Sequence, residues 1–264
     1  MIHDMYFSAR KKLDQKTSNL SKKLNLLVDN FSSRVWYSFF IYPLFKLYKN
    51  VGKNKVILKF DVWEESSLRI SKIRHLPYLI KKIFDPKEIF FIDIDKKLVS
   101  LSKKNMKYFG FKKAVVVNGD ISNMPFKDNT FDVIIDFSTT DHLNFIKLKS
   151  TIEKIHKVLK KNGYLIIYHL NSEYFNIKSW NYQYSSGLFP SYARKLSTLK
   201  ALLSKKFEVV DFGYCFPFFV DNTLFIYYRF LYNKLYRFLP RKLLFSFLNS
   251  SKLNLFFYLI AYKI

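Results

Sequence analysis

The chain has 264 residues, a single cysteine (Cys215) and a formal net charge of +25. One cysteine excludes an internal disulfide and a cysteine-based zinc cluster, and we assign no metal site. No apolar run reaches the ~18 residues of a confident transmembrane helix, and the N-terminal residues lack the apolar segment of a secretory signal. We therefore expect a cytoplasmic protein.

The positive charge has two readings. It suits binding to nucleic acid or to an anionic membrane. However, the basic residues are mostly lysine and are scattered along the chain, which is also rich in Asn, Ile, Phe and Tyr, as AT-rich codons would produce. Arginine supplies the bidentate contacts of a specialised phosphate or base reader. The composition therefore favours a solvated basic surface over dedicated nucleic-acid binding.

Residues 1–50 are predicted to form a helical N-terminal extension. Apolar residues recur there at helical spacing: Leu13, Leu20, Leu24, Leu27, Phe31 and Val35. They lead into the apolar stretch "VWYSFFIYPLF", which is too short to span a bilayer.

From residue 51 the pattern alternates between strands and helices. Strand-length apolar runs are "VILKF", "IFFIDI", "AVVVN", "FDVIIDF" and "YLIIYHL". A helix is expected over 150–163, with Ile152, Ile155 and Leu159 on one face and Gly163 near its end. A helix over 192–205, the strand "FEVVDF" and a terminal strand-like run "LFFYLIAYKI" follow. This order predicts an open, doubly wound α/β sheet, whose ligands bind beyond the carboxyl ends of the strands.

Two stretches resemble the class I S-adenosylmethionine-dependent methyltransferases. "NGDISNMPFKDNTFDVIID" is similar to that family's adenine-site loop and fourth strand. "TIEKIHKVLKKNGYLIIY" is similar to its fifth helix–strand unit, with Lys157 and Asn162 in place of the usual arginine and first glycine. The resemblance implies a Rossmann-like sheet of seven strands, the last antiparallel, and S-adenosyl-L-methionine as cofactor. We divide residues 51–264 of the methyltransferase domain into a core (55–213), a cap or insertion (214–252) and the terminal strand (253–264).

The resemblance also assigns residues to the adenosine part of the cofactor. Asp93 stands where the family's acidic residue accepts hydrogen bonds from the ribose hydroxyls, a task for which a carboxylate is suited. Asp95 is a second choice, or a cap of the following helix. Asp120 matches the acid that binds the adenine amino group, and Ile121 supplies a backbone amide and an apolar wall.

The first strand lacks the family's glycine-rich ending, D-x-G-x-G-x-G. The matching stretch is "LKFDVWEES", and no glycine occurs between Gly52 and Gly110. Asp61 or Glu64 is predicted to bind the α-amino group of the cofactor, and Lys59 its carboxylate. The bulk of the side chains at positions 62 and 63 stands where a close backbone approach is usual. A strand end with solvated acids, and so a degenerate site, is the alternative.

After the fourth strand comes "DFSTTDHL", where the family often has an acidic residue followed by a histidine. His142 matches that histidine and is the candidate general base, since a histidine can take a proton from a hydroxyl near neutral pH. Ser138 falls at the preceding polar position and is a candidate cofactor contact. His169 and Asn171 are weaker candidates, and a histidine that only caps a helix is the alternative for His142.

No motif of the sequence identifies the methyl acceptor, so its class is inferred from composition. The aromatic loop over 172–189 is expected above the site, and residues 216–248 combine Phe, Tyr and Leu with Arg229, Lys234, Arg237, Arg241 and Lys242. This mixture is typical of an interfacial segment on an anionic membrane, and equally of core or dimer packing. We expect a small or hydrophobic acceptor, including a lipid-linked or cell-envelope one, with peripheral contact at the inner face of the membrane. An RNA methyltransferase and an inactive scaffold are the alternatives.

Overall fold

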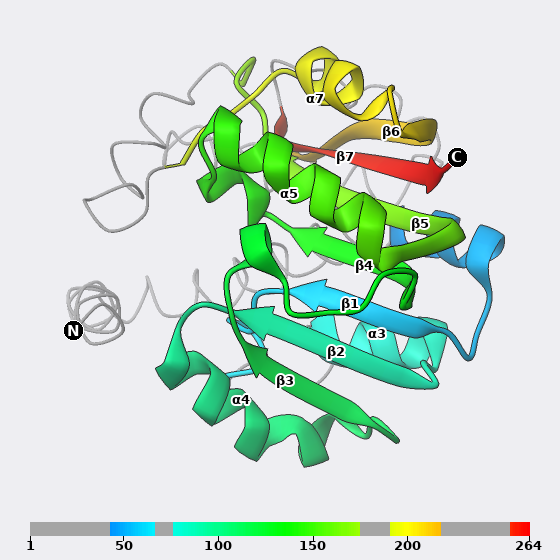
Figure 1. Cartoon of the computed structure of the whole chain (residues 1–264), viewed down its shortest axis with the longest axis vertical. Helices are drawn as coiled ribbons and strands as arrows, with labels where there is room; N and C mark the ends of the chain where they lie inside the picture. The colour runs from blue at the N-terminus through cyan, green and yellow to red at the C-terminus, as the bar shows by residue number, and fades with distance from the viewer. Residues whose placement is uncertain (1–42, 67–75, 175–190, 218–253) are drawn as a thin grey trace, which may run out of the picture.

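The structure is a computed structural model that describes residues 43–66, 76–174, 191–217 and 254–264 (Figure 1). Our expectations for residues 1–42, for most of the aromatic loop and for the segment 218–253 lie outside these residues. In the described part of the chain, no helix has both the length and the apolar character needed to cross a membrane.

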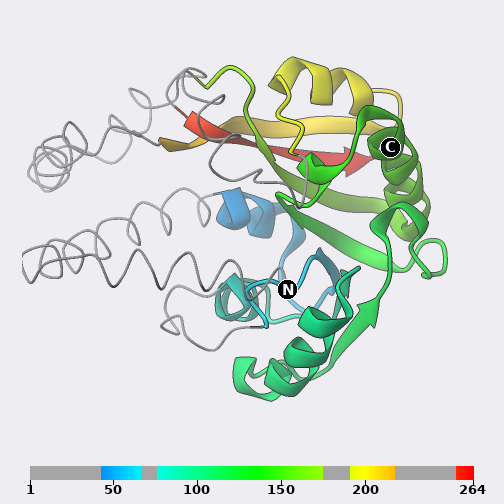
Figure 2. The same cartoon turned by 90° about the vertical axis from the view of Figure 1, so that its left-hand side faces the viewer.

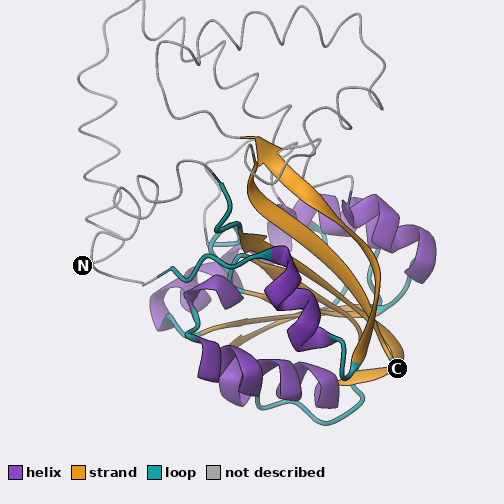
Figure 3. Cartoon of the chain, turned by 90° about the horizontal axis from the view of Figure 1, so that it is seen from above, coloured by secondary structure: helices purple, strands orange, loops and turns teal. Residues whose placement is uncertain are grey.

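Seven strands form one sheet in the order β3-β2-β1-β4-β5-β7-β6, which can be followed in Figure 1. Figure 3 shows the same sheet in orange, seen from above. Strands β1 to β5 are parallel, and β7 pairs antiparallel with both β5 and β6. The predicted doubly wound sheet with an antiparallel last strand is confirmed. The strands are β1 (Val56–Phe60), β2 (Glu88–Asp93), β3 (Ala114–Asn118), β4 (Phe131–Phe137), β5 (Leu159–Leu170), β6 (Phe207–Pro217) and β7 (Asn254–Lys263).

Helices cover both faces of the sheet (Figures 1 and 2). A helix over 43–51, α3 (Leu76–Phe84) and α4 (Lys96–Phe109) pack on one face, where their apolar residues share a buried cluster with Ile57 of β1. On the other face α5 (Phe145–Val158) and α7 (Leu196–Leu203) share a second cluster with Leu58. Neighbouring residues of a strand point to opposite faces, so β1 is buried on both sides, as its apolar sequence requires.

The predicted helix over 150–163 is wrong at both ends. The helix α5 begins earlier, where the Asn144 side chain accepts a hydrogen bond from the Lys147 amide, and it ends at Val158. The backbone amide of Thr130 donates to the Val158 carbonyl oxygen. Leu159, which is expected on the face of this helix, is instead the fully buried first residue of β5. The pairing of this segment with β4 replaces the last helical turn.

Candidate active site

Acidic residues gather in the sequence where the parallel strands end, at the sheet edge marked by the arrowheads of β1, β2 and β4 in Figure 1. Among the residues that the structure describes, eight acidic ones lie at or just beyond the ends of β1 to β4. In a chain with 45 basic residues, this local excess of acid favours a ligand that carries positive charge. The eight are Asp61, Glu64, Glu65, Asp93, Asp95, Asp120, Asp136 and Asp141.

Asp93, the last residue of β2, joins two of the loops at this edge. Its Oδ2 accepts a hydrogen bond from the Val62 amide at 3.0 Å, and its Oδ1 accepts one from the Asp95 amide at 2.9 Å. Burial raises the pKa of Asp93, although these two amides oppose the shift. Each oxygen keeps a lone pair for a further donor. Asp95 instead caps α4, since its side chain accepts from the Lys97 and Leu98 amides.

Asp120 and Ile121 follow β3 and lie beside the end of β2. The backbone amide of Gly119 donates to the Asp93 carbonyl oxygen at 2.9 Å, which ties the two strand ends together. Asp120 Oδ1 accepts from the Ser122 amide at 2.7 Å, and Ile121 is 6% exposed. The acid and the apolar wall that the sequence assigns to the adenine are therefore on adjacent residues next to Asp93.

The loop after β1 contains no glycine, and its backbone and side chains adapt to that. Asp61, the first residue after β1, has a φ of 60°, in the left-handed region that glycine occupies most readily. Trp63 is 44% exposed, and the side chain of Glu65 is fully buried. In this loop the side chain of Trp63 therefore points toward solvent and that of Glu65 into the core.

Lys59 is buried, at 1% exposure, and its ammonium group is surrounded by acceptors. Its Nζ lies 3.0 Å from Asp61 Oδ1 and 3.1 Å from Glu65 Oε2. Burial alone would lower the pKa of Lys59, but Asp61, Glu65 and Glu64 raise it overall. Lys59 is therefore charged and faces its own loop.

Glu64 is used at the start of α3. Its Oε2 accepts a hydrogen bond from the Leu76 amide at 2.7 Å, a favourable position for a carboxylate because the N-terminus of a helix carries partial positive charge. Burial raises the pKa of Glu64 to about 7. Of the two acids predicted to bind the α-amino group, Glu64 already holds a helix end, whereas Asp61 faces the loop after β4.

The loop after β4 holds Ser138, Asp141 and His142. Ser138 has a φ of 66°, and its hydroxyl donates to Asp141 Oδ2 at 2.6 Å. The side chain of His142 is 44% exposed, and its Nε2 lies 3.7 Å from Asp141 Oδ1, which accepts no hydrogen bond from the described residues. Burial raises the pKa of Asp141 to about 7. The exposed part of the His142 ring is accessible to a ligand.

His169 is buried and belongs to a different network. Its Nε2 lies 3.1 Å from Arg194 Nη1 and accepts its hydrogen bond, while burial lowers the pKa of His169 to about 3. Arg194 also donates to the carbonyl oxygens of Leu143 and Tyr192. Arg194 is not predicted from the sequence, because nothing in "SYARKL" distinguishes it from the other basic residues of the chain.

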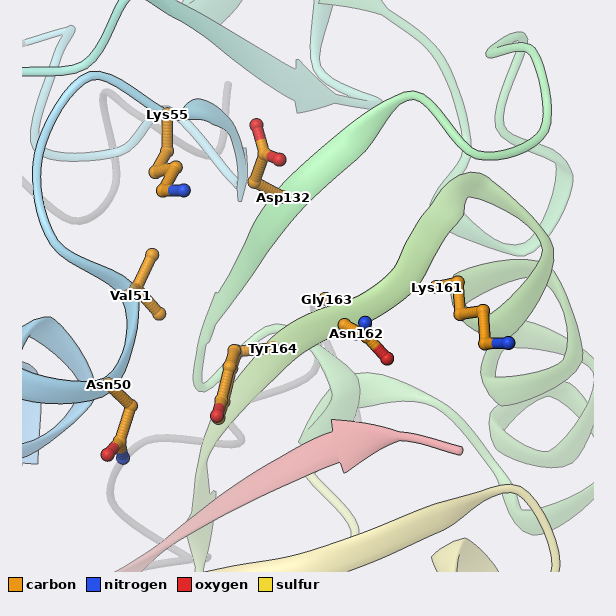
Figure 4. Close-up of a pocket in the computed structure, with 8 residues that line it drawn as sticks. All are labelled: Asn50, Val51, Lys55, Asp132, Lys161, Asn162, Gly163 and Tyr164. Atoms are coloured by element: carbon orange, nitrogen blue, oxygen red, sulfur yellow. The ribbon is translucent and has the colours of Figure 1, made fainter.

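A small pocket of about 90 Å³ lies at the opposite edge of the sheet, where β1, β4 and β5 begin (Figure 4). Asp132, one of its lining residues, already accepts from the Val56 amide and pairs with Lys160. The predicted site residues lie at the other edge, so this pocket is separate from them.

Comparisons with known proteins agree with this arrangement. A family model described as a methyltransferase domain matches residues 74–212, more than half of the chain. A demethylmenaquinone methyltransferase of Bacillus pumilus is 20% identical over 168 residues, covering 56% of this chain and 70% of that protein. An uncharacterised protein of Methanocaldococcus jannaschii is 31% identical over 75 residues, so the chain matches about a third (32%) of that relative's length and 28% of its own.

Solved structures share the fold. A structure from Methanosarcina mazei described as a SAM-dependent methyltransferase superposes with a TM-score of 0.56 at 16% identity, covering 83% of this chain and 96% of that one. The N-methyltransferase NodS of Bradyrhizobium japonicum, in complex with S-adenosyl-L-homocysteine, gives 0.53 at 12% identity, with 84% of both chains covered. The sheet order, the acidic strand ends and the matched family model lead to one conclusion: the chain belongs to the methyltransferase-domain family.

Proposed function

We propose that this methyltransferase, whose cofactor is S-adenosylmethionine, transfers the methyl group to a small or hydrophobic acceptor. The observation that carries the proposal is the gathering of carboxylates at the ends of β1 to β4 in an otherwise basic chain. S-adenosylmethionine has a sulfonium and an ammonium group against one carboxylate, so an acidic edge complements its net positive charge.

The residues at this edge fit the cofactor. Asp93 would hold the ribose hydroxyls, because both of its oxygens keep acceptor capacity after binding the Val62 and Asp95 amides. Asp120 and Ile121 would hold the adenine on the neighbouring strand end. Asp61 has a left-handed conformation, and the loop that it begins passes Asp93, which accepts a hydrogen bond from the Val62 amide. Ser138 remains a candidate contact from the β4 side.

When bound, the cofactor supplies an electrophilic methyl group. The chain's contribution is to align the acceptor with that group and to exclude water. Where the acceptor is a hydroxyl, His142 would accept its proton, since the ring is half-exposed beside the buried Asp141. Asp141 would stabilise the resulting imidazolium.

The hydrophobic acceptor is supported by the relative from Bacillus pumilus, whose name gives demethylmenaquinone as its substrate. It is also supported by the aromatic and basic composition of residues 216–248, which lie beyond the described residues except at 216 and 217. The same composition supports peripheral contact with an anionic membrane.

Two measurements test the proposal. Calorimetric titration with S-adenosylhomocysteine should give saturable binding, and its absence at millimolar ligand would support the inactive scaffold. Incubation with methyl-labelled S-adenosylmethionine and a cell extract should then move label into the organic phase, and less so for His142→Gln. Label in the precipitated RNA would support the RNA alternative.

A further inference from the structure

The two oxygens of the Asp61 carboxylate differ in how many hydrogen bonds they accept. Its Oδ1 accepts from Lys59 Nζ at 3.0 Å and from the Trp63 amide at 3.1 Å. Its Oδ2 accepts from the Thr139 hydroxyl at 3.2 Å. A carboxylate has about four lone-pair sites, so Oδ2 keeps room for one more donor. The side chain is 22% exposed, and a ligand can therefore reach it.

Lys59 is not placed to bind a ligand itself. At 1% exposure its Nζ contacts Asp61, Glu65 and the carbonyl oxygens of residues 60 and 61. An ammonium group has three donors, and all of them are occupied by these acceptors. Binding the carboxylate of the cofactor would require Lys59 to leave buried carboxylates without a partner, which is costly.

The order of charges along this loop differs from the family's pattern. In D-x-G-x-G-x-G the acid is the residue within the strand and the first glycine has no side chain. In this chain β1 ends with Lys59 and Phe60, and the acid, Asp61, is the first residue after the strand. The carboxylate has therefore moved toward the end of the strand, and the buried lysine fixes its direction.

We propose that Asp61 binds the α-ammonium group of the cofactor through Oδ2, and that Lys59 is a positioning residue that holds Asp61 Oδ1. The inference rests on the proposed function, because it assumes that the cofactor occupies the edge described above. It replaces the predicted contact between Lys59 and the cofactor's carboxylate with an indirect role. Glu65, whose Oε2 accepts from Lys59, anchors the lysine from the core side.

The test compares two ligands that differ only in the amino-acid part. S-adenosylhomocysteine carries the α-ammonium group, whereas 5′-methylthioadenosine has the same adenosine without it. For Asp61→Asn, calorimetric titration should show affinity for S-adenosylhomocysteine reduced about 10- to 100-fold. Its affinity for 5′-methylthioadenosine should stay within about twofold, because that ligand has no α-ammonium group. A residue that only supported the fold would change the affinity for both ligands.

Lys59 is tested with the double substitution Lys59→Met and Glu65→Leu. Removing the lysine alone would leave Glu65 as an uncompensated buried charge and risk unfolding, whereas the pair of apolar replacements avoids it. The double variant should lose affinity for S-adenosylhomocysteine selectively, as Asp61→Asn does. Asp93→Asn should weaken both ligands, and Asp128→Asn, at an exposed position before β4, should weaken neither.

The outcomes separate the two proposals. If the unmodified chain binds neither ligand, the proposed function fails and the inference falls with it. If it binds both but Asp61→Asn weakens them equally or not at all, Asp61 is not the ammonium anchor and only the inference is overturned. If Asp61→Asn is selective but the double variant keeps its affinity for S-adenosylhomocysteine, the positioning role of Lys59 is wrong.

Discussion

The Thr139 hydroxyl donates a hydrogen bond to Asp61 Oδ2 at 3.2 Å, across 78 positions of sequence. Thr139 follows β4 and Asp61 follows β1, two neighbouring parallel strands. The Thr139 amide is in turn held by Asp136 Oδ1 at 2.9 Å. The loops on either side of the candidate cofactor site are therefore joined by side chains at the point where the sheet's strands end.

Breaking this link should weaken both the fold and ligand binding. Thr139→Val keeps the shape of the side chain and removes the donor, so the free energy of unfolding should fall by about 1 kcal/mol. Affinity for S-adenosylhomocysteine, measured by calorimetry, should fall several-fold because Asp61 loses one of its three restraints. Thr130→Val, which removes a hydroxyl bonded to Lys127 at the opposite edge, is the matched control. Equal affinity losses in both variants would contradict the prediction.

Asp93→Ala should weaken cofactor binding by about 1.5–3 kcal/mol, because hydrogen bonds to an ionised group are lost. Calorimetric titration measures the loss. The substitution also frees the Val62 and Asp95 amides, so unfolding by urea should be recorded alongside. Unchanged affinity in a folded variant would remove Asp93 from the ribose site.

The stability of the chain should depend on pH through Asp136. Burial raises the pKa of Asp136 from 3.8 to about 7, against the hydrogen bonds from Thr140 and Thr139. The folded state thus binds a proton more tightly than the unfolded state. That contribution to stability is complete below pH 3.8 and is lost as the pH rises through about 7.

Asp136→Asn should therefore unfold at a higher urea concentration than the unmodified chain at pH 8, with a gain of roughly 1–3 kcal/mol. At pH 5, where the Asp136 carboxyl is mostly protonated in the folded state, the two should differ much less. Asp128→Asn, at an exposed position, should show no such dependence. A difference between Asp136→Asn and the unmodified chain that is the same at both pH values would refute the assignment.

The proposed membrane contact is tested on residues outside the described part of the chain. Replacing Arg237, Arg241 and Lys242 with glutamate should release the protein from anionic vesicles in a sedimentation assay, because each basic side chain near such a surface contributes about 1 kcal/mol. Affinity for S-adenosylhomocysteine should not change.

The matched control for that experiment replaces three exposed lysines of α4, Lys103, Lys104 and Lys107, with glutamate. It changes the net charge by the same amount at another place. If the unmodified chain does not bind vesicles, or if both triple variants are released alike, the segment 216–248 has no specific role at a membrane.

The sequence by itself determined the order of strands and helices and the positions of Asp93 and Asp120. The two positions follow from local pattern, because one strand-length run ends at Asp93 and another ends two residues before Asp120, and parallel strands end at one edge. The C-terminal end of α5 could not be predicted from the local pattern, because Leu159 pairs with β4 and so belongs to a strand.

Only the tertiary structure decided what the residues around the missing glycines do. Lys59 and Asp61 are two positions apart, and as a sequence they could equally be two ligand contacts. The distinction depends on which of them the sheet buries: Lys59 is enclosed with Glu65, while Asp61 turns left-handed and meets Thr139. Burial and long-range hydrogen bonds depend on residues far away in the chain, so a local pattern carries no record of them.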